Sequence, residues 1–378
     1  MSGLYLHIPF CEQKCVYCDF YSIEDRSPVD DFLRALHTEI DLRAPDGAGE
    51  TFGTIYFGGG TPSLLPPNEL RRILEHLHRV FKIRPDAEVT LEANPGTTDR
   101  ASLRGFHDAG VNRLSLGIQS FHDDELAFLS RIHSAADANE AIRAARAAGF
   151  RNLSIDLIFA LPRQSMESWK DNLQKALATG AEHISAYSLI VEPGTPLQRM
   201  VKAGTVTPSP TEKEAEMYEL TMSFLASAGF EHYEVSNYAR PGFHSIHNSS
   251  YWNHTPYIGF GPSAHSFRNG RRWWNVASLQ PYCRRLVGGE LPVSGSEELT
   301  RIQLRDEAIM LGLRSGGIDC ATLKDIHGVD LIASLNGEIH QLIHDRLAVL
   351  ESSLLRLTDR GFLLCDAIGE RFVSRLPS

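Results

Sequence analysis

The sequence lacks any hydrophobic run that could cross a membrane, and it lacks an excess of basic residues. No apolar segment approaches the roughly 18 residues that a membrane-spanning helix needs, and 37 Lys and Arg are outnumbered by 47 Asp and Glu. The formal net charge of −10 argues against a nucleic-acid partner, because such proteins usually carry a basic face. We expect no signal peptide, since a cysteine motif begins already at Cys11. The 378 residues therefore predict a cytoplasmic protein with one large or two medium domains.

Cysteine is also scarce, with six residues in the chain, yet three of them fall within eight positions. These are Cys11, Cys15 and Cys18, while Cys283, Cys320 and Cys365 are scattered. A structural cysteine behaves as a small hydrophobe and needs no neighbours at fixed spacing. The cluster therefore predicts thiolates that converge on one iron–sulfur centre, with one iron left open for a ligand. The alternatives are a zinc site with His7 as fourth ligand, and cysteines without a shared role.

Strand and helix patterns alternate six times between residues 3 and 189, which is typical of a parallel sheet. The expected strands are 3–8, 54–57, 88–92, 113–117, 153–158 and 183–189. Units of this length favour a barrel. We therefore predict an α/β fold, with a partial TIM-type (β/α)6 barrel over residues 1–235.

Unusual residues stand at or near the C-terminal ends of these expected strands. They are the cysteine loop, Gly58–Gly60, Glu92, Gln119, Asp156 and Tyr187. In barrels, this end of the strands builds the active site. The glycines would let a ligand approach the backbone closely, although an ordinary tight turn is the alternative.

The rest of the chain has a different character. Residues 236–295 form an aromatic- and histidine-rich connecting segment, and within it residues 243–274 are expected to be an ordered loop. Residues 296–378 predict a smaller, mainly helical domain, with helices at 299–313, 322–327 and 334–350. The last stretch, residues 354–374, is expected to be a turn between strands followed by a helix, like the wing of a winged-helix domain.

The run YLHIPFCEQKCVYCDFYS, residues 5–22, resembles the cluster motif of radical S-adenosylmethionine (SAM) proteins, in the HemN/HemW branch. The resemblance implies a [4Fe–4S] cluster held by Cys11, Cys15 and Cys18, with SAM chelating the open iron. It also implies that Gly59, Gly60 and Thr61, in the motif GGGTPS, contribute to the site that holds the amino group of SAM. By the same resemblance, Tyr17 lines the adenine and Tyr5 lies near bound SAM.

Four further residues match the family pattern in order: Glu92, Gln119, Arg131 and Asp156. Their chemistry suits a sulfonium that carries an amino acid and a ribose. An arginine can pair with a carboxylate, and carboxylates can accept ribose hydroxyls or offset positive charge. A salt bridge at the barrel rim is the alternative for any one of them.

Two features resemble the HemW-like haem chaperones more than the oxygen-independent coproporphyrinogen III oxidases. The oxidases carry a further cysteine two residues after the third, where this chain has Phe20. His247 begins HNSSYW, which matches an H-N-x-x-Y-W motif associated with haem binding in that subgroup. An imidazole is a good axial haem ligand, so we expect His247 to bind haem, with His244, His254 and His265 as alternatives.

The resemblance thus implies a chaperone that carries haem as cargo to haem-accepting proteins, such as respiratory enzymes, and lacks coproporphyrinogen oxidase activity. It also implies an electron donor as a partner and allows transient association with a membrane; the oligomeric state stays open. The alternative functions are the oxidase itself and, as a weaker reading, a zinc-bound structural protein.

Overall fold

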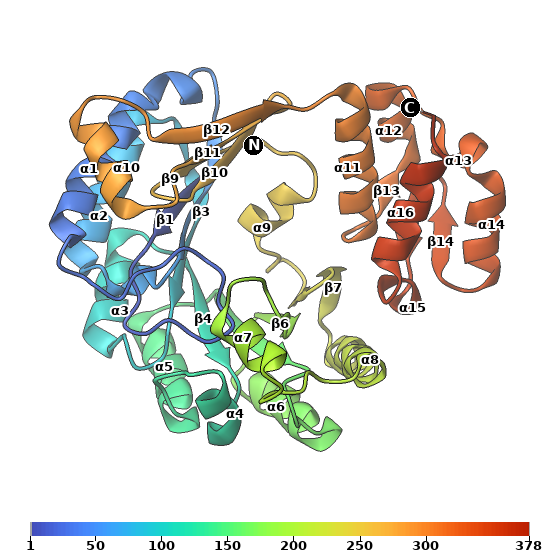
Figure 1. Cartoon of the computed structure of the whole chain (residues 1–378), viewed down its shortest axis with the longest axis horizontal. Helices are drawn as coiled ribbons and strands as arrows, with labels where there is room; N and C mark the ends of the chain where they lie inside the picture. The colour runs from blue at the N-terminus through green and yellow to red at the C-terminus, as the bar shows by residue number, and fades with distance from the viewer. Residues whose placement is uncertain (1, 378) are drawn as a thin grey trace.

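Six parallel strands alternate with helices in the first half of the chain and form the predicted partial barrel (Figure 1). The computed structural model describes residues 2–377. The strands are β1 (Ser2–Ile8), β2 (Phe52–Gly59), β3 (Ile83–Ala93), β4 (Arg113–Gln119), β5 (Leu153–Phe159) and β6 (His183–Ser188). The sheet runs β1-β2-β3-β4-β5-β6 in chain order, and every neighbouring pair is parallel. Their C-terminal ends therefore meet at one edge, as the sequence predicted.

Helices cover the outside of this sheet (Figure 1). The helices up to Ser227 are α1 (Val29–Leu42), α2 (Pro67–Val80), α3 (Arg100–Ala109), α4 (Asp123–Phe128), α5 (Ala135–Ala148), α6 (Met166–Ala178), α7 (Pro196–Lys202) and α8 (Thr211–Ser227), with short 3-10 turns η1 (Ala44–Gly47) and η2 (Pro62–Leu64). Of these, α7 lies beside the cysteine loop, where the Leu197 amide donates to Val16 O at 2.9 Å. Reciprocal side-chain caps from Asp99 and Ser134 start α3 and α5, and left-handed glycines, Gly110 and Gly149, end them. In residues 2–377 no helix is long and apolar enough to span a membrane.

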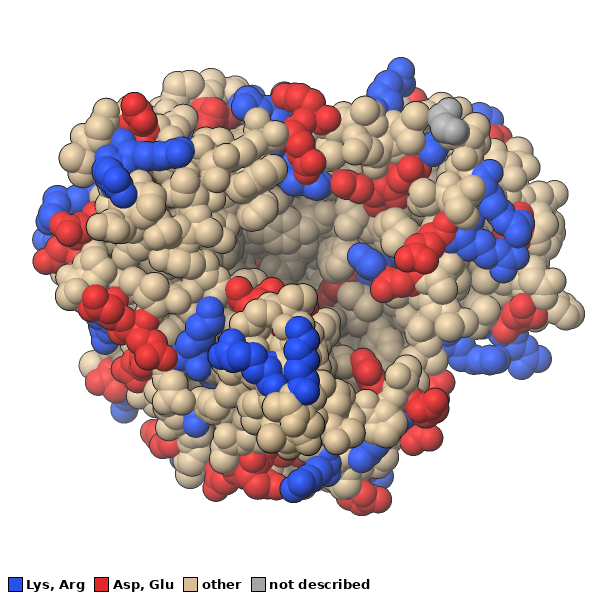
Figure 2. Space-filling model, viewed as in Figure 1, with Lys and Arg blue, Asp and Glu red and all other residues tan. Residues whose placement is uncertain are grey.

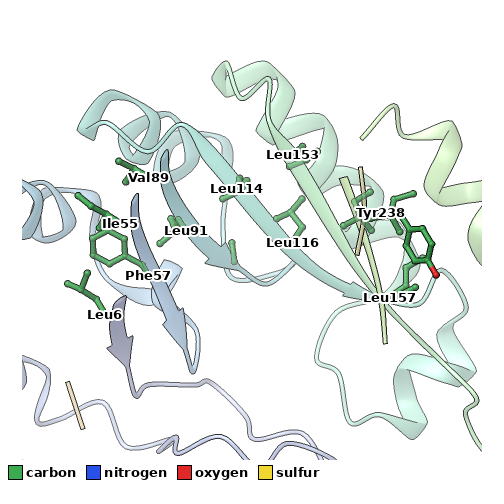
Figure 3. Packing of buried hydrophobic residues seen from close by; sticks show 14 of the residues in the cluster. Leu6, Ile55, Phe57, Val89, Leu91, Leu114, Leu116, Leu153, Leu157 and Tyr238 are labelled. Atoms are coloured by element: carbon green, nitrogen blue, oxygen red, sulfur yellow. The ribbon is translucent and has the colours of Figure 1, made fainter. Parts of the chain in front are cut away.

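The core lies between the strands and these helices. Alternate leucine and isoleucine side chains of neighbouring strands pack together, among them Leu6, Ile55, Leu91, Leu114 and Leu157 (Figure 3). The strands are buried along most of their length, as expected for a parallel sheet covered by helices. Polar side chains within them are therefore exceptions that need partners or a ligand.

The expected loop at 243–274 is wrong, because this stretch holds a helix and three strands. The elements from residue 231 to 298 are β7 (Glu231–Glu234), β8 (Asn237–Ala239), α9 (Ile246–Tyr251), β9 (Tyr257–Phe260), β10 (His265–Arg268), β11 (Arg271–Asn275), α10 (Leu279–Val287) and β12 (Val293–Glu298). The connecting segment adds strands to both edges of the sheet, since β9 pairs with β1 and β8 with β6. Its glycines lie between strands: Gly261 and Gly270 have φ of 93° and 77°. They mark turns rather than a long loop.

A buried ion pair fastens this extension to the barrel. Arg43 donates from Nε to Glu39 Oε1 at 2.8 Å and from Nη2 to Asn275 Oδ1 at 2.8 Å. Glu39 also accepts hydrogen bonds from Tyr282 at 2.7 Å and from the Gly261 amide at 2.8 Å. Because every one of these groups is paired, their burial is tolerated and holds β11 and α10 against α1.

The C-terminal domain is a small sheet surrounded by helices. It contains α11 (Arg301–Leu313), β13 (Ile318–Asp319), α12 (Cys320–His327), α13 (Leu331–Ser334), α14 (Asn336–His344), β14 (Ala348–Glu351), β15 (Leu354–Leu357), α15 (Asp359–Phe362) and α16 (Cys365–Arg375). The expected turn between two strands in residues 354–374 is wrong in its second strand, because β15 pairs with the preceding β14 and residues after Thr358 form α15; the expected helix at the end is α16. The expected helix over 334–350 is wrong beyond His344, because Arg346 takes a left-handed φ of 60° and the chain then enters β14.

Candidate functional site

The cysteine loop follows β1 and closes on itself at its base. The Cys11 amide donates to Ile23 O at 2.9 Å, and the Ile23 amide donates to Pro9 O at 2.7 Å. Cys11, Cys15 and Cys18 all border a cavity of about 430 Å³ at the C-terminal ends of the strands, which we call the barrel cavity. The loop therefore presents its three thiols to the place where the strand ends converge.

Two donors from neighbouring loops reach these thiols. Thr61 Oγ1 donates to Cys11 Sγ at 3.7 Å, and Arg131 Nη1 donates to Cys15 Sγ at 3.4 Å. Burial raises the pKa of the Cys18 thiol to about 11 and also raises that of Cys11. A bound metal deprotonates a coordinating thiol outright, so these half-buried thiols, two of them with donors beside them, suit an iron–sulfur cluster. Within residues 2–377, no group of three metal-ligating side chains is close enough together to hold a single metal ion. The fit to a cluster is therefore argued from the three thiols and the hydrogen-bond donors beside them.

His7 is held away from the thiols. Its Nε2 lies 2.8 Å from Tyr21 O and its Nδ1 lies 3.3 Å from the Tyr5 hydroxyl, and burial lowers its pKa to about 4. His7 is absent from the lining of the barrel cavity. His7 is therefore not placed to be the fourth ligand of the zinc site that was the alternative to an iron–sulfur centre.

The glycine run after β2 is packed tightly against the end of β1. A Cβ on Gly60 would lie 2.6 Å from Phe10 O, and Gly59 has φ of 109° with the His7 ring beside it. The Gly60 and Thr61 amides donate to Ile8 O at 2.8 Å and Phe10 O at 2.7 Å. Only glycine fits this approach, and Gly59, Gly60 and Thr61 line the cavity next to the cysteine loop.

Two half-buried carboxyl groups face the cavity, Glu92 from β3 and Asp156 from β5. Glu92 Oε1 accepts a hydrogen bond from the Tyr56 hydroxyl at 2.7 Å, and burial raises the Glu92 pKa to about 7. Asp156 accepts from Ser115 Oγ at 3.1 Å, and burial raises its pKa as well. A cationic ligand would stabilise the ionised form of both groups.

Arg131 brings a positive charge to the cavity, which Lys14 also lines. Its Nη2 donates to Gly117 O at 2.8 Å and to Asn94 Oδ1, which fixes the guanidinium. Its Nε is buried without a hydrogen-bond partner among the described residues. A buried donor without a partner calls for an acceptor, and the carboxylate of an amino-acid ligand meets that need.

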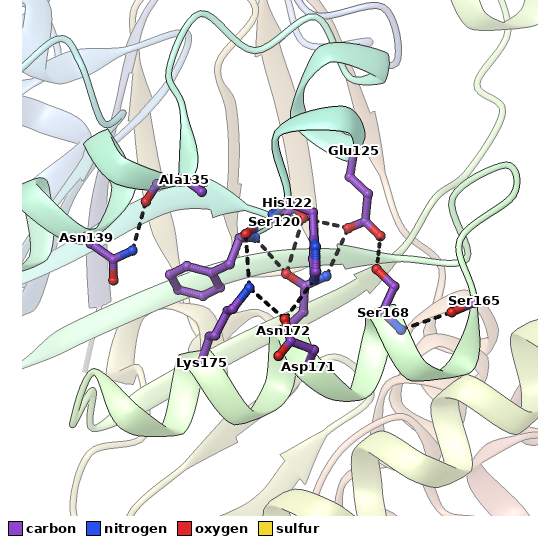
Figure 4. Close-up of polar contacts among 11 residues, drawn as sticks. Ser120, His122, Glu125, Ala135, Asn139, Ser165, Ser168, Asp171, Asn172 and Lys175 are labelled. Carbon is purple, nitrogen blue, oxygen red and sulfur yellow. Dashed lines mark hydrogen bonds and ion pairs between the residues drawn. The ribbon is translucent and has the colours of Figure 1, made fainter.

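The loop that carries Gln119 and Arg131 is anchored by a buried polar network (Figure 4). Glu125 accepts from Ser120 Oγ at 2.6 Å, from Ser168 Oγ at 2.6 Å and from Asn172 Nδ2 at 2.9 Å. The network joins α4 to α6 directly after Gln119, which has a φ of 66°. It fixes where β4 ends and where the following loop returns to the cavity.

The predicted site residues are almost all brought together here. The barrel cavity is lined by Cys11, Cys15, Cys18, Tyr17, Gly59, Gly60, Thr61, Glu92, Gln119, Arg131, Asp156 and Tyr187. Tyr5 lies one layer behind, its ring stacked on Tyr56 with centroids 6.1 Å apart. Tyr56, Asn94 and Ser115 were missed, although the position of Tyr56 two residues before the glycine run was a signal for it.

His247 lies apart from the cavity and is fully buried. Its Nδ1 is 2.8 Å from Thr54 Oγ1 and its Nε2 is 2.9 Å from the Tyr251 hydroxyl, so both ring nitrogens are engaged. Burial lowers its pKa to about 3. Ligation of haem by His247 stays a prediction and requires α9 to move. His244 and His254 border a second, larger cavity, whereas His265 stacks on Trp274.

Comparison with known proteins identifies the class. Residues 5–176 match the radical SAM superfamily, and residues 299–364 match the HemN C-terminal domain. The chain is 36% identical to the heme chaperone HemW of Bacillus subtilis over 100% of both chains, and 38% identical to HemW of Mycobacterium tuberculosis over 97% of this chain and 93% of that one. The solved structure of coproporphyrinogen III oxidase (HemN) from Escherichia coli aligns with a TM-score of 0.86 at 25% identity, covering 99% of this chain and 91% of that chain. The chain belongs to the HemW family of radical SAM proteins.

Proposed function

We propose that this protein is a haem chaperone that binds haem, a [4Fe–4S] cluster and SAM, and passes haem to acceptor haem proteins. The observation that carries the proposal is full-length similarity to proteins named heme chaperone HemW. The barrel cavity supports the cofactor part, because the residues that the radical SAM pattern requires line one cavity. A compartment that keeps thiols reduced, such as the cytoplasm, suits the three cysteines.

The residues of the barrel cavity divide the binding of SAM among them. Cys11, Cys15 and Cys18 would hold the cluster, which when bound supplies an electron to the sulfonium. Arg131, through its unpartnered Nε, would pair with the carboxylate of SAM. Glu92 and Asp156 would face its cationic and ribose portions. An external electron donor and transient membrane contact with acceptors belong to the same proposal.

Phe20 favours the chaperone over coproporphyrinogen oxidation. It lines the barrel cavity and is 61% exposed, at the position where the oxidases have a further cysteine. The overall alignment with HemN does not separate the two functions, because it covers both domains in both proteins. The support for the chaperone at this point is the Phe20 side chain at the cavity mouth.

The test is haem transfer. Anaerobically reconstituted protein is loaded with haem and mixed with an apo-haem protein, and the absorption spectrum of the acceptor is followed. We expect stoichiometric binding and transfer, with no decarboxylation of coproporphyrinogen III in the presence of SAM and reductant. Coproporphyrinogen turnover without specific haem binding would reverse the assignment.

A further inference from the structure

A second cavity, of about 1190 Å³, lies between the barrel sheet and the C-terminal domain. We call it the interdomain cavity. The face seen in Figure 2 is hollowed over α9, where the two parts of the molecule meet. This volume is at or above the upper end of ordinary ligand pockets, about 300–1,000 Å³. It is the larger of the two cavities described, and the SAM-binding residues do not use it.

The walls of the interdomain cavity present apolar side chains from both domains, beside the acidic Glu231, Asp319 and Asp359. Trp252 and Phe267 line it from the barrel side, and Leu323, Ile326 and Phe362 line it from the C-terminal domain. Ile326 is 60% exposed and Val349, which also lines the cavity, is 37% exposed, whereas Phe267, Leu323 and Phe362 are buried. Two exposed aliphatic side chains at the mouth of one cavity are consistent with a binding surface.

His327 stands in this wall with a free ring. It is the last residue of α12 and half-buried, and neither of its nitrogens forms a hydrogen bond or ion pair within residues 2–377. Burial lowers its pKa, and the nearby His254 lowers it further. A neutral imidazole is the form that ligates iron. By contrast, His254 Nε2 lies 3.1 Å from Glu307 Oε2, and His244 Nε2 lies 2.7 Å from Glu231 Oε2.

A cation is also present for the acidic side chains of a porphyrin. Arg356 lines the cavity, and its Nε is buried without a partner among the described residues. Its Nη2 is paired with Glu351 at 2.5 Å. A propionate carboxylate is the acceptor that such a donor fits.

We propose that the interdomain cavity is the haem site, that His327 is the axial ligand and that Trp252 and Ile326 cover the porphyrin faces. This rests on the proposed chaperone function and deepens it. The proposal also explains the two ends of the motif that begins at His247. Trp252 lines the interdomain cavity, while His247 is buried and holds α9 in position through contacts with Thr54 and Tyr251.

The test is haem titration into reconstituted full-length protein, read by difference absorption, for wild type, His327→Ala and Ile326→Glu. Matched controls are His344→Ala, an exposed histidine on α14, and Val287→Glu, an apolar side chain that is 87% exposed away from both cavities. Circular dichroism checks that each variant is folded. We expect His327→Ala to weaken binding roughly tenfold or more, as removal of an anchoring side chain does, and to shift the Soret band. Ile326→Glu should also weaken binding, and both controls should match wild type.

The outcomes separate the inference from the function on which it rests. If wild type does not bind haem, both fail. If wild type binds haem and neither His327→Ala nor Ile326→Glu changes affinity or spectrum, the chaperone stands and the interdomain site is wrong. An effect of His247→Ala alone would move the ligand to α9.

Discussion

The two cavities of this protein are built in opposite ways. Many side chains of the barrel cavity stand at the ends of successive strands of one parallel sheet, and they include the carboxyl groups of Glu92 and Asp156. The walls of the interdomain cavity come from two domains and combine aromatic and aliphatic side chains with histidines and the acidic Glu231, Asp319 and Asp359. A rigid sheet can hold several charges at fixed separations, which suits a small ionic ligand. Walls on separate domains can part, which suits a bulky ligand that must leave again.

Polar contacts join those two domains. Arg272 Nη2 lies 2.8 Å from Glu307 Oε2, and the Val235 amide donates to Arg314 O at 2.8 Å. Apolar contacts cross the interface too: the rings of His232 and Phe362 have centroids 4.6 Å apart. Release of a ligand from the interdomain cavity would have to part contacts of both kinds.

The largest effect expected is loss of the cluster, which would show whether the two cavities bind their ligands independently. Replacing any one of Cys11, Cys15 and Cys18 with Ala should abolish incorporation of the [4Fe–4S] cluster, measured as iron, sulfide and absorbance after anaerobic reconstitution. Cys283→Ala, on α10, is the control and should retain the cluster. Haem binding should survive in the cluster-free variants; its loss would show that the cavities are not separate.

A smaller effect is expected at Arg131, which sharpens the account of the barrel cavity. Arg131→Ala removes a charged donor from a buried site, and hydrogen bonds to charged groups contribute about 1.5–3 kcal/mol. SAM affinity should fall by roughly 10- to 100-fold in calorimetric titration. Arg104→Ala, which removes an exposed arginine paired with Asp108, should leave affinity unchanged. Equal affinity in both variants would contradict the role given to Arg131.

The pH dependence of SAM binding should follow Glu92. Its pKa is raised to about 7, so ionisation provides a negative charge for the sulfonium as pH rises. Between pH 6 and 8 the ionised fraction grows roughly tenfold, and affinity should grow accordingly. Glu92→Gln should flatten this profile. A steep profile that persists in the variant would assign the titration to another group.

The same raised pKa has a consequence for stability without ligand. A carboxyl group whose folded pKa lies above its unfolded value of 4.5 stabilises the fold most below pH 4.5 and loses that contribution as pH approaches 7. In the ligand-free wild type, the free energy of unfolding should therefore fall as pH rises from 4.5 to 7, and in Glu92→Gln this fall should be absent. Urea unfolding at several pH values measures it.

The smallest effect is expected in the network behind Gln119. Asn172→Ala leaves the Phe121 amide and Glu125 short of a partner, so unfolding free energy should fall by about 1–3 kcal/mol. Asn139→Ala removes an exposed bond to Ala135 O and should change it by less than about 0.5 kcal/mol. Urea unfolding compares the two. Similar values would mean that the network does not anchor the loop.

The sequence was sufficient to predict the site residues that stand at the ends of strands. The barrel and the residues at its strand ends were predicted because polar residues interrupt otherwise apolar strands at corresponding places. The strands β9–β11 were missed, because each is at most five residues long and too short to show a clear alternation. Tyr56 was missed because its role depends on Glu92, a residue from the next strand.

The interdomain cavity could not be predicted from sequence either. Its walls combine residues such as Trp252 and Ile326, which are more than seventy positions apart, and no local pattern marks their meeting. The sequence predicted His247 as the haem ligand because the six residues of its motif are consecutive and can be recognised without the fold. The structure shows that this histidine has both ring nitrogens occupied.

The short helix α9 forms a partition between the two cavities: Asn248 lines the barrel cavity, and Ser249 and Trp252 line the other. A ligand in one cavity that displaces α9 also changes the shape of the other cavity. Thermodynamic linkage then makes the influence mutual, so that any factor by which SAM changes haem affinity equals the factor by which haem changes SAM affinity. A helix of six residues would in this way let the protein release its cargo in response to the state of its cofactor site.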